Sequence, residues 1–388
     1  MSREARFIDS PLLLTYQFYE GHPFTQQRVP LTRSLLEALG WLEEKQILPP
    51  RIATDEELQL VHDKGYIQLV KAVSTPDTLS AELRQQASQH GLGTEDTPLF
   101  PHMHEAAALV VGATLTAVEL VMEQGIPHAL NLAGGLHHAL SGKASGFCIY
   151  NDCAVAIAYM RKKYDARILY IDTDAHHGDG VQWAFYHDPQ VMTISLHETG
   201  KYLFPGTGHI TERGDGPGLG FTLNLPLEPY TEDESFISIY QSIITEAVKV
   251  FRPDVIITQN GADAHRWDPL THLACSTAIY QIIPQLVHEL AHQYCEGRWI
   301  ATGGGGYDIY RVVPRAWALL WGVMSEQEIT QLPLPPSWLQ QWQPHSKEHL
   351  PSHLFDTPFP AMPRKQEIME KNQRTADRVR DYLQHSHS

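Results

Sequence analysis

The sequence predicts an α/β protein: a single three-layer α/β/α domain built around a mainly parallel central sheet. From about residue 104 onward, segments with helical periodicity alternate with short runs of β-forming residues. These runs are apolar on both faces, which is typical of parallel strands covered by helices on both sides. Because crossovers between parallel strands are right-handed, this alternation builds one sheet between two layers of helices.

The expected elements follow one another in a regular order. The helical segments are residues 104–123, 152–163, 232–251, 276–294 and 307–321. The strands are residues 129–133, 167–171, 191–196, 221–225, 254–258 and 299–302. The first helix is the most apolar segment, but Thr114, Thr116 and Glu119 interrupt it. We therefore expect it in the core of the domain and not in a membrane.

Composition and charge narrow the class of protein. Hydrophobic residues make up 43% of the 388 residues and charged residues 19%, which indicates a globular protein with a sizeable core. The formal net charge of −16 repels phosphate backbones and anionic lipid, so we expect neither nucleic-acid nor membrane partners. The four cysteines form no CxxC pair, and the first residues lack the apolar core of a signal peptide. These features predict a reduced, cytoplasmic protein.

Polar side chains and glycines follow four of the expected strands. The four segments are Gly134-Gly-Leu-His137-His138, Asp172-Thr-Asp174-Ala-His176-His-Gly-Asp179, Gln259-Asn-Gly-Ala-Asp263 and Gly303-Gly-Gly-Gly306-Tyr307. In open α/β sheets the ligand site lies beyond the carboxyl ends of the strands. One such segment would mean little, but four at equivalent strand ends predict a functional site at that edge of the sheet.

Three of these side chains are candidate metal ligands. Asp174 and His176 lie two residues apart on an extended segment, so both side chains can point the same way. With Asp263 they offer a divalent cation two carboxylates and one imidazole. Three protein ligands leave positions open for water and substrate, which is typical of catalytic zinc, and ferrous iron suits the same donors. The alternative, that these aspartates cap a helix or lie in a solvated loop, does not account for the other three strand ends.

The histidine pair and the tyrosine suggest proton transfer and carbonyl activation. His137 and His138 are adjacent and point in different directions, so each needs its own carboxylate, and Asp172 and Asp179 are the unassigned acids nearby. Tyr307 follows four glycines without the Lys-Ser/Thr of a phosphate-binding loop, and its phenol could donate to a developing oxyanion. The alternatives are core histidines bonded to the backbone and a packing tyrosine.

At these residues the sequence resembles the histone deacetylase superfamily, the zinc-dependent acyl-lysine amidohydrolases with an arginase-like fold. The matching stretches are His22-Pro23, Leu60-Val-His62, Gly134-Gly-Leu-His137-His138, residues 144–152, residues 172–180, Ser195-Leu196-His197, Phe204-Pro-Gly206-Thr-Gly208, Asn260-Gly-Ala-Asp263 and Gly303-Gly-Gly-Gly306-Tyr307. They cover about residues 5–322, which implies a deacetylase domain over residues 1–322. The phrases at residues 93–98, 149–150 and 261–265 look most similar to the bacterial acetoin utilisation branch.

The resemblance implies a role for each of these residues. The zinc ligands would be Asp174, His176 and Asp263, and Tyr307 would polarise the scissile carbonyl. Two histidines would handle protons, each with an aspartate behind it: His138 with Asp179 as general base, and His137 with Asp172 as electrostatic or acid partner. The superfamily also holds structural potassium. By position its ligands would be Asp172, Asp174, His176, Ser195 and Leu196. A second potassium site would involve Phe185, Asp188, Val191 and Phe221.

The resemblance also implies how a substrate is held. The substrate-binding residues would be Asp96, Gly146, Phe147, Phe204, Leu270 and Gly305. Asp96 would bind the substrate backbone at the rim of a narrow apolar tunnel for the lysine stem. Leu270 stands where polyamine deacetylases carry an acidic residue, which favours acyl-lysine over a polycation. Arg28 would lie at the foot of the pocket, where acetate could leave.

We expect one metal ion at this site and not two. Arginase relatives hold two manganese ions and need carboxylates at two further positions, and this chain has Gly178 and His265 there. We expect a zinc deacetylase acting on acetyl-lysine in proteins or peptides, with acetyl-CoA synthetase as a candidate substrate. The alternatives are an amidohydrolase of acetylpolyamines or other small acylated amines, and a non-enzymatic acyl-lysine binder. The sequence leaves the oligomeric state open.

The remaining segment, residues 323–388, changes character. Its prolines are Pro333, Pro335, Pro336, Pro344, Pro351, Pro358, Pro360 and Pro363. Because proline opposes regular structure, we expect an extended run over the surface from about residue 331. A last helix at about residues 365–383 has a weak apolar stripe, Ala376, Val379 and Leu383, that could dock on the body or on a partner.

Overall fold

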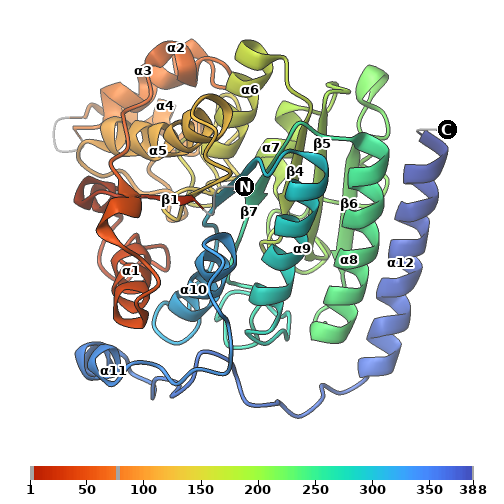
Figure 1. Cartoon of the computed structure of the whole chain (residues 1–388). Coiled ribbons are helices and arrows are strands. Elements are labelled where there is room, and N and C mark those ends of the chain that lie inside the picture. Colours follow the sequence, from red (N-terminus) through yellow and green to blue (C-terminus); the bar gives the residue numbers. More distant parts are fainter. Residues whose placement is uncertain (1–3, 76–78, 387–388) are drawn as a thin grey trace.

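A computed structural model describes residues 4–75 and 79–386 of the chain and shows one eight-stranded sheet in which every strand pairing is parallel (Figure 1). The strands are β1 (Ala5–Ile8), β2 (Ile47–Leu48), β3 (His128–Asn131), β4 (Ile168–Asp172), β5 (Val191–Glu198), β6 (Thr222–Leu227), β7 (Val255–Gln259) and β8 (Trp299–Thr302). Their order is β2-β1-β3-β8-β7-β4-β5-β6. The predicted fold class is therefore confirmed.

The strand order explains how distant motifs meet. The four strands whose ends carry the predicted functional segments, β3, β8, β7 and β4, are consecutive neighbours in the sheet. Because all of them are parallel, their carboxyl ends lie along one edge. Residues near positions 137, 174, 263 and 307 are thereby brought to the same place.

Helices cover both faces of the sheet. They are α1 (Arg28–Leu39), α2 (Asp55–Leu58), α3 (Lys64–Val73), α4 (Ala81–Gln89), α5 (Met103–Glu123), α6 (Asp152–Tyr164), α7 (Asp179–Ala184), α8 (Asp233–Phe251), α9 (Ile279–Tyr294), α10 (Val313–Met324), α11 (Pro336–Trp342) and α12 (Lys365–Ser386). Helices α1, α10, α9, α8 and α12 pack side by side in that order (Figure 1), and α5 packs against α6, β3 and β8. Buried residues from both layers and the sheet form one continuous core.

The most apolar helix belongs to that core. By length and composition α5 could cross a bilayer, but 78% of its most apolar stretch is buried inside the fold. It packs on the sheet and on α6. This burial is that of a core helix, as its interrupting polar residues predicted.

Two expectations about helices were wrong. The helix expected from residue 307 begins only at Val313, and the segment before it is a loop. Pro314 lies in the first turn of this helix, where proline is tolerated. The segment after residue 331 is not uniformly extended, since α11 begins at Pro336. Helix α11 can begin with proline because proline is tolerated in a first helical turn. The buried Trp338 holds α11 against α1 by donating from Nε1 to Ser34 Oγ at 3.1 Å.

The C-terminal segment folds back onto the domain. Ala376, Val379 and Leu383 of α12 are buried, and α12 packs on α8 and β6. Asn372 adds polar contacts, accepting from the backbone N–H of Glu228 at 2.9 Å. Of the two alternatives for the apolar stripe, the structure shows docking on the body.

Candidate metal centre and active site

Two neighbouring strands supply the three candidate metal ligands. Asp174 and His176 follow β4, and Asp263 follows β7. His176 Nδ1 lies 3.0 Å from Asp174 Oδ1 and 3.0 Å from Asp263 Oδ2. All three side chains are buried, and their ligand atoms lie within 4.8 Å of one another. The spacing predicted from sequence is thus present in space.

The electrostatics of this triad suit a cation. Burial and the charge of Asp174 together raise the pKa of Asp263 to about 7. Although burial alone would lower it, hydrogen bonds to Asp174 and Asp263 hold the pKa of His176 well above its ordinary value. The triad therefore retains protons that a divalent ion would displace. Two carboxylates and one imidazole are a donor set that fits zinc and also ferrous iron.

Residues outside the triad orient its carboxylates. Asp174 Oδ2 accepts hydrogen bonds from Gln259 Nε2 at 2.6 Å and from the backbone N–H of Gly305 at 2.6 Å. Asp263 Oδ1 accepts from the backbone N–H of Ala175 at 2.9 Å. A Cβ atom at Gly305 would lie 2.1 Å from Asp263 Oδ2, so only glycine fits there. Gly305 therefore acts by close backbone approach to the centre.

The histidine pair forms the two predicted dyads. His137 Nδ1 lies 2.7 Å from Asp172 Oδ2, and His138 Nδ1 lies 2.7 Å from Asp179 Oδ1. The two Nε2 atoms face each other at 3.0 Å. All four side chains are buried. Each imidazole is thus held through Nδ1, which leaves Nε2 for proton exchange.

The two histidines differ in their pKa values. Although burial opposes it, the charges of Asp172 and Asp174 raise the pKa of His137 to about 9. Burial and the neighbouring His137 lower the pKa of His138 to about 4. At neutral pH the pair holds one extra proton, on His137, and His138 is a neutral base. Adjacent residues with opposite protonation are suited to acid–base chemistry.

Backbone geometry brings the histidines to the metal ligands. The carboxylate of Asp152 accepts from the backbone N–H of Gly135 at 3.0 Å and of Leu136 at 2.7 Å, which holds the turn after β3. A Cβ atom at Gly146 would lie 2.2 Å from His138 Cδ2, and Gly146 has a φ of +52°. Glycine is therefore required at position 146, beside the imidazole.

Tyr307 lies next to the triad. Its ring centroid is 6.2 Å from that of His176, and its backbone N–H donates to Asp268 Oδ2 at 2.8 Å. Burial and the carboxylates of Asp174 and Asp263 raise the pKa of the phenol well above its ordinary value. The hydroxyl therefore remains protonated at neutral pH and can donate a hydrogen bond.

Residues 22–324 match the family described as histone deacetylase domain, which is most of the chain. The chain belongs to the histone deacetylase family. It is 55% identical over 383 residues to the acetoin utilization protein AcuC of Bacillus subtilis (strain 168), covering 97% of each chain. It is 46% identical over 377 residues to AcuC of Staphylococcus aureus (strain MSSA476), covering 97% of this chain and 96% of the other.

Solved structures of the family agree in fold. An HDAC homolog from Aquifex aeolicus superposes with a TM-score of 0.83 at 30% identity, covering 95% of this chain and 100% of that one. An HDAC homolog complexed with SAHA gives the same values. This histone deacetylase family member is thus a hydrolase of the AcuC type, as the sequence resemblance implied.

Aromatic rings surround the approach to the centre of this deacetylase. The Phe204 ring packs edge-on against His138 at 5.0 Å between centroids, and Phe147 packs against Tyr307 at 5.9 Å. Phe204 is 46% exposed, which places it at the opening. Asp96 is partly buried, and its Oδ2 accepts from the backbone N–H of Gly146, the residue before Phe147, at 2.8 Å.

Two further predicted residues border the site. Leu270 is 37% exposed, and its backbone N–H donates to Asp268 Oδ1 at 2.9 Å, which ties it to the loop that holds Tyr307. Arg28 is buried and donates from Nη1 to the carbonyl oxygens of Gly304 at 2.8 Å and Gly306 at 3.1 Å. The guanidinium therefore lies beneath the glycine segment that precedes Tyr307.

The residues assigned to potassium lie beside the metal triad or along β5. Asp172 and Ser195 are register partners of β4 and β5, and Ser195 Oγ lies 2.8 Å from His197 Nδ1. Leu196 follows on the same strand. The second set lies in a turn: Asp188 N–H donates to Phe185 O at 3.0 Å, Val191 N–H donates to Asp188 O at 3.3 Å, and Phe221 O accepts from Thr193 N–H at 2.9 Å. Both potassium sites stay predictions.

The two positions that differ from arginases offer the centre no carboxylate. Gly178 has no side chain to bind a metal, and His265 Nε2 lies 2.8 Å from Asp356 Oδ2. Neither is part of the group of candidate ligands formed by Asp174, His176 and Asp263. This geometry favours one metal at the centre.

Sequence reasoning gave no role to three residues of the site. Gln259 bonds the Asp174 carboxylate, Asp268 holds the backbone of Tyr307, and Asp152 holds the turn after β3. Gln259 and Asp152 lie next to the functional segments in the sequence, so their position could have indicated that they orient the site. The contacts of Asp268 depend on a loop closure that spacing does not reveal.

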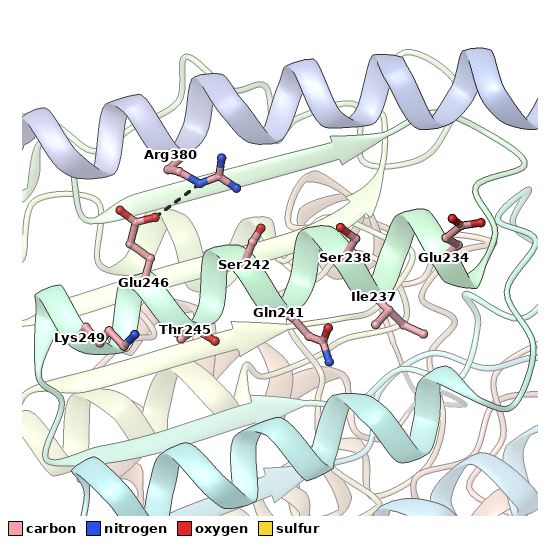
Figure 2. A pocket seen from close by; sticks show the side chains of 9 residues that line it. All are labelled: Glu234, Ile237, Ser238, Gln241, Ser242, Thr245, Glu246, Lys249 and Arg380. Atoms are coloured by element: carbon pink, nitrogen blue, oxygen red, sulfur yellow. Dashed lines mark ion pairs between the residues drawn. The ribbon is translucent and has the colours of Figure 1, made fainter.

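A large groove of the molecule lies elsewhere. It has a volume of about 910 Å³ and runs along α8 (Figure 2). Its lining residues are Glu234, Ile237, Ser238, Gln241, Ser242, Thr245, Glu246, Lys249 and Arg380. Arg380 of α12 faces Glu246 of α8 across it at 3.5 Å. None of the strand-end residues contributes to this groove.

Proposed function

We propose that this protein is a cytoplasmic zinc-dependent deacetylase that hydrolyses the amide of N-ε-acetyl-lysine in protein substrates to lysine and acetate. The observation that carries the proposal is the buried triad Asp174, His176 and Asp263 beside a neutral His138 and a protonated Tyr307. The aromatic rings of Phe147 and Phe204 beside Tyr307 and His138 suit the aliphatic stem of an acyl-lysine. Family membership supports the same reaction class.

The residues of the triad would hold the zinc ion. Bound zinc supplies Lewis acidity, which lowers the pKa of water toward about 7 and polarises a carbonyl. His138, neutral and held by Asp179, accepts the proton of the attacking water. The Tyr307 hydroxyl donates a hydrogen bond to the carbonyl oxygen as negative charge develops on it.

Collapse of the tetrahedral intermediate needs a proton for the leaving amine. The carbon–nitrogen bond breaks as the amine accepts a proton from the histidine pair, so that lysine and acetate leave. His137 carries the extra proton of the pair 3.0 Å from His138. Its charge stabilises the developing anion and supports the return of the proton.

Substrate and product are bound by the residues around the centre. Phe147 and Phe204 would line the lysine stem, and Asp96 at the opening would accept hydrogen bonds from the substrate backbone. Arg28, buried beneath the segment before Tyr307, would attract acetate. Potassium at the predicted sites would neutralise part of the carboxylate charge around the zinc.

The test is an assay of purified protein on a fluorogenic acetyl-lysine peptide. We expect activity that a chelator abolishes and zinc restores, with ferrous iron as the alternative metal. Competition with acetylpolyamine tests the alternative function, an amidohydrolase of acetylpolyamines. The net charge of −16 favours that function, whereas Leu270 disfavours it. Activity that survives complete metal removal contradicts the proposal, as does a strong preference for acetylpolyamine over acetyl-lysine. Binding of the peptide without turnover in the zinc-loaded protein would indicate a binder.

A further inference from the structure

A second group of metal-type side chains lies at the opposite end of the sheet. His128 is the first residue of β3, whereas the histidine pair of the active site follows the last residue of that strand. His288 and His292 lie one turn apart on α9, which packs against the neighbouring strand β8. Residues four apart on a helix share a face, so both imidazoles are directed to the same side.

The three imidazoles are close enough to share an ion. His128 Nε2 and His292 Nε2 are 3.2 Å apart. The ring centroids of His288 lie 4.9 Å from His128 and 4.5 Å from His292. One ligand nitrogen from each residue lies within 4.8 Å of those of the other two. Nitrogens bound at about 2.0–2.1 Å around a tetrahedral metal lie about 3.3 Å apart, so one pair already has the required spacing.

Hydrogen bonding does not account for this cluster. The facing Nε2 atoms of His128 and His292 can share one proton in a hydrogen bond. That bond leaves the position of His288 unexplained. Among the described residues, the buried Nε2 of His288 has no hydrogen-bond partner. His128 is 2% exposed, so its polar atoms are removed from bulk water. Buried polar atoms without partners are uncommon in proteins and often indicate an ion or ligand.

A carboxylate lies beside one of the three histidines. The carboxylate oxygen Oε1 of Glu326 lies 3.7 Å from His288 Nε2. Glu326 follows the C-terminal end of α10, a third element that packs on α9. The three imidazoles, with this carboxylate beside one of them, bring together β3, α9 and the end of α10.

We propose that His128, His288 and His292, with Glu326, form a second metal site that binds zinc. Neutral imidazoles favour zinc and its transition-metal neighbours over calcium or magnesium, which prefer oxygen ligands. The set differs from that of the active site, where two carboxylates accompany one imidazole. A site closed by four protein ligands is structural in type, since it leaves no open position for a substrate.

The sequence of α9 supports the ligand spacing. His288-Glu-Leu-Ala-His292 has the HExxH pattern, in which two histidines on one helix face bind zinc. In zinc peptidases the intervening glutamate is the general base, but Glu289 is exposed here. The pattern therefore contributes two ligands, and Glu289 provides a matched control on the same helix turn.

The site would stabilise the row of helices on one face of the sheet. A bound ion would tie α9 to the start of β3 and to the end of α10. The other end of α9 carries Tyr280, whose hydroxyl donates to the carbonyl oxygen of Ala262 at 2.7 Å, next to the predicted ligand Asp263. Zinc bound only by the folded state raises the melting temperature in a concentration-dependent way.

The first test counts metal ions. The metal-free full-length protein is titrated with zinc against a chelating indicator and its bound zinc is measured by mass spectrometry. We expect two zinc ions per chain in the wild type and in Glu289→Gln, but one in the double variant His288→Gln/His292→Gln. Because both substituted histidines are only partly buried, the metal-free variants should retain the circular dichroism and melting temperature of the metal-free wild type. The single variant His288→Gln serves if the double variant unfolds.

The second test identifies the ligands. In Asp263→Asn, which disrupts the active-site triad, copper(II) bound at the remaining site should show coupling to three nitrogens by electron paramagnetic resonance. That coupling should disappear when His292→Gln is added. Equal zinc binding by the wild type and the double variant would overturn the proposal, and so would copper coupling to fewer than three nitrogens in Asp263→Asn.

Discussion

Two clusters of candidate metal ligands lie at opposite ends of the same sheet, and they differ in charge. Asp174, His176 and Asp263 carry two carboxylates, and backbone N–H groups hold those carboxylates in place. The second cluster, His128 with His288 and His292, consists of imidazoles, and the buried Nε2 of His288 has no hydrogen-bond partner among the described residues. The first cluster lies beside the buried pair His137 and His138. The second has none of these groups beside it.

The difference teaches which features make a metal site catalytic. Both clusters have three donors at suitable distances, so donor geometry alone does not distinguish them. The first cluster also has His138 and the Tyr307 hydroxyl beside it, with the rings of Phe204 and Phe147 packed against them. A cation at the second cluster would be enclosed by protein ligands and would act on stability.

The largest expected effect is the loss of activity when the first cluster is broken. Asp263→Asn removes one of the two carboxylate ligands, and we expect deacetylase turnover to fall by about a thousandfold or more. His292→Gln, in the second cluster, should leave turnover within about twofold, because it does not touch the reacting groups. Steady-state assays of both variants at saturating zinc measure the contrast. A comparable loss in His292→Gln would show that the two ends of the sheet are coupled.

In a third buried cluster of histidine and carboxylate, the positive charge comes from an arginine of the protein, Arg315, and not from a metal ion. Asp356, from the C-terminal segment, lies 2.8 Å from both Arg315 Nη1 and His265 Nε2, and all three side chains are buried. Breaking a buried pair of this kind leaves a charge without its partner. We expect Asp356→Asn to lower the free energy of unfolding by about 3–5 kcal/mol. Urea denaturation at pH 7 measures this loss, with exposed Asp377→Asn of α12 as a control within about 0.5 kcal/mol.

The same carboxylate gives this stability a pH dependence. Although burial opposes it, His265 and Arg315 hold the pKa of Asp356 below its ordinary value. A lowered folded-state pKa means that the stabilisation is fully present above the unfolded-state pKa of about 3.9 and is lost as the pH falls through the folded-state pKa. The stability difference between wild type and Asp356→Asn should therefore be constant from pH 7 to pH 5 and shrink in more acidic buffer. A difference that grows on acidification would contradict this assignment.

The sequence could predict the first cluster but not the second, for a physical reason. Asp174, His176 and Asp263 follow strands whose apolar runs are visible, and parallel strands bring their carboxyl ends together. His128 and His292 are 164 residues apart and meet only because α9 packs on β8, the strand next to β3 in the sheet. The period of α9 indicates which of its faces is buried but not which strand it will cover.

Errors in the predicted elements have a similar origin. Short strands such as β1 and β2 contain too few residues to show an alternating hydrophobic pattern. The second source of error is proline, which was expected only to interrupt helices and strands. Pro314 and Pro336 instead lie in first helical turns, where the missing N–H costs nothing. The loop that carries Tyr307 depends on a contact with Asp268 that no local pattern indicates.

Removal of the Tyr307 hydroxyl tests the chemistry of the first cluster without changing its ligands. The ring of Tyr307 packs on Phe147 and lies near His176, so Tyr307→Phe should preserve the fold. We expect kcat to fall by about 10²–10³, corresponding to about 2.7–4 kcal/mol, because the developing oxyanion loses a hydrogen bond. KM and bound zinc should change little. An unchanged kcat would exclude the phenol from carbonyl polarisation.

The smallest expected effect concerns charge at the opening of the site. Leu270 is partly exposed, so a carboxylate introduced by Leu270→Glu would be hydrated and would attract a cationic substrate by about 0.2–1 kcal/mol. We expect the ratio of kcat/KM for acetylpolyamine over acetyl-lysine peptide to rise by about two- to fivefold at low salt and to return toward the wild-type value in about 1 M salt. Leu270→Gln, of similar size but neutral, should leave the ratio unchanged. If the ratio rises equally in both variants, side-chain shape and not charge controls entry, and the leucine no longer favours acyl-lysine on electrostatic grounds.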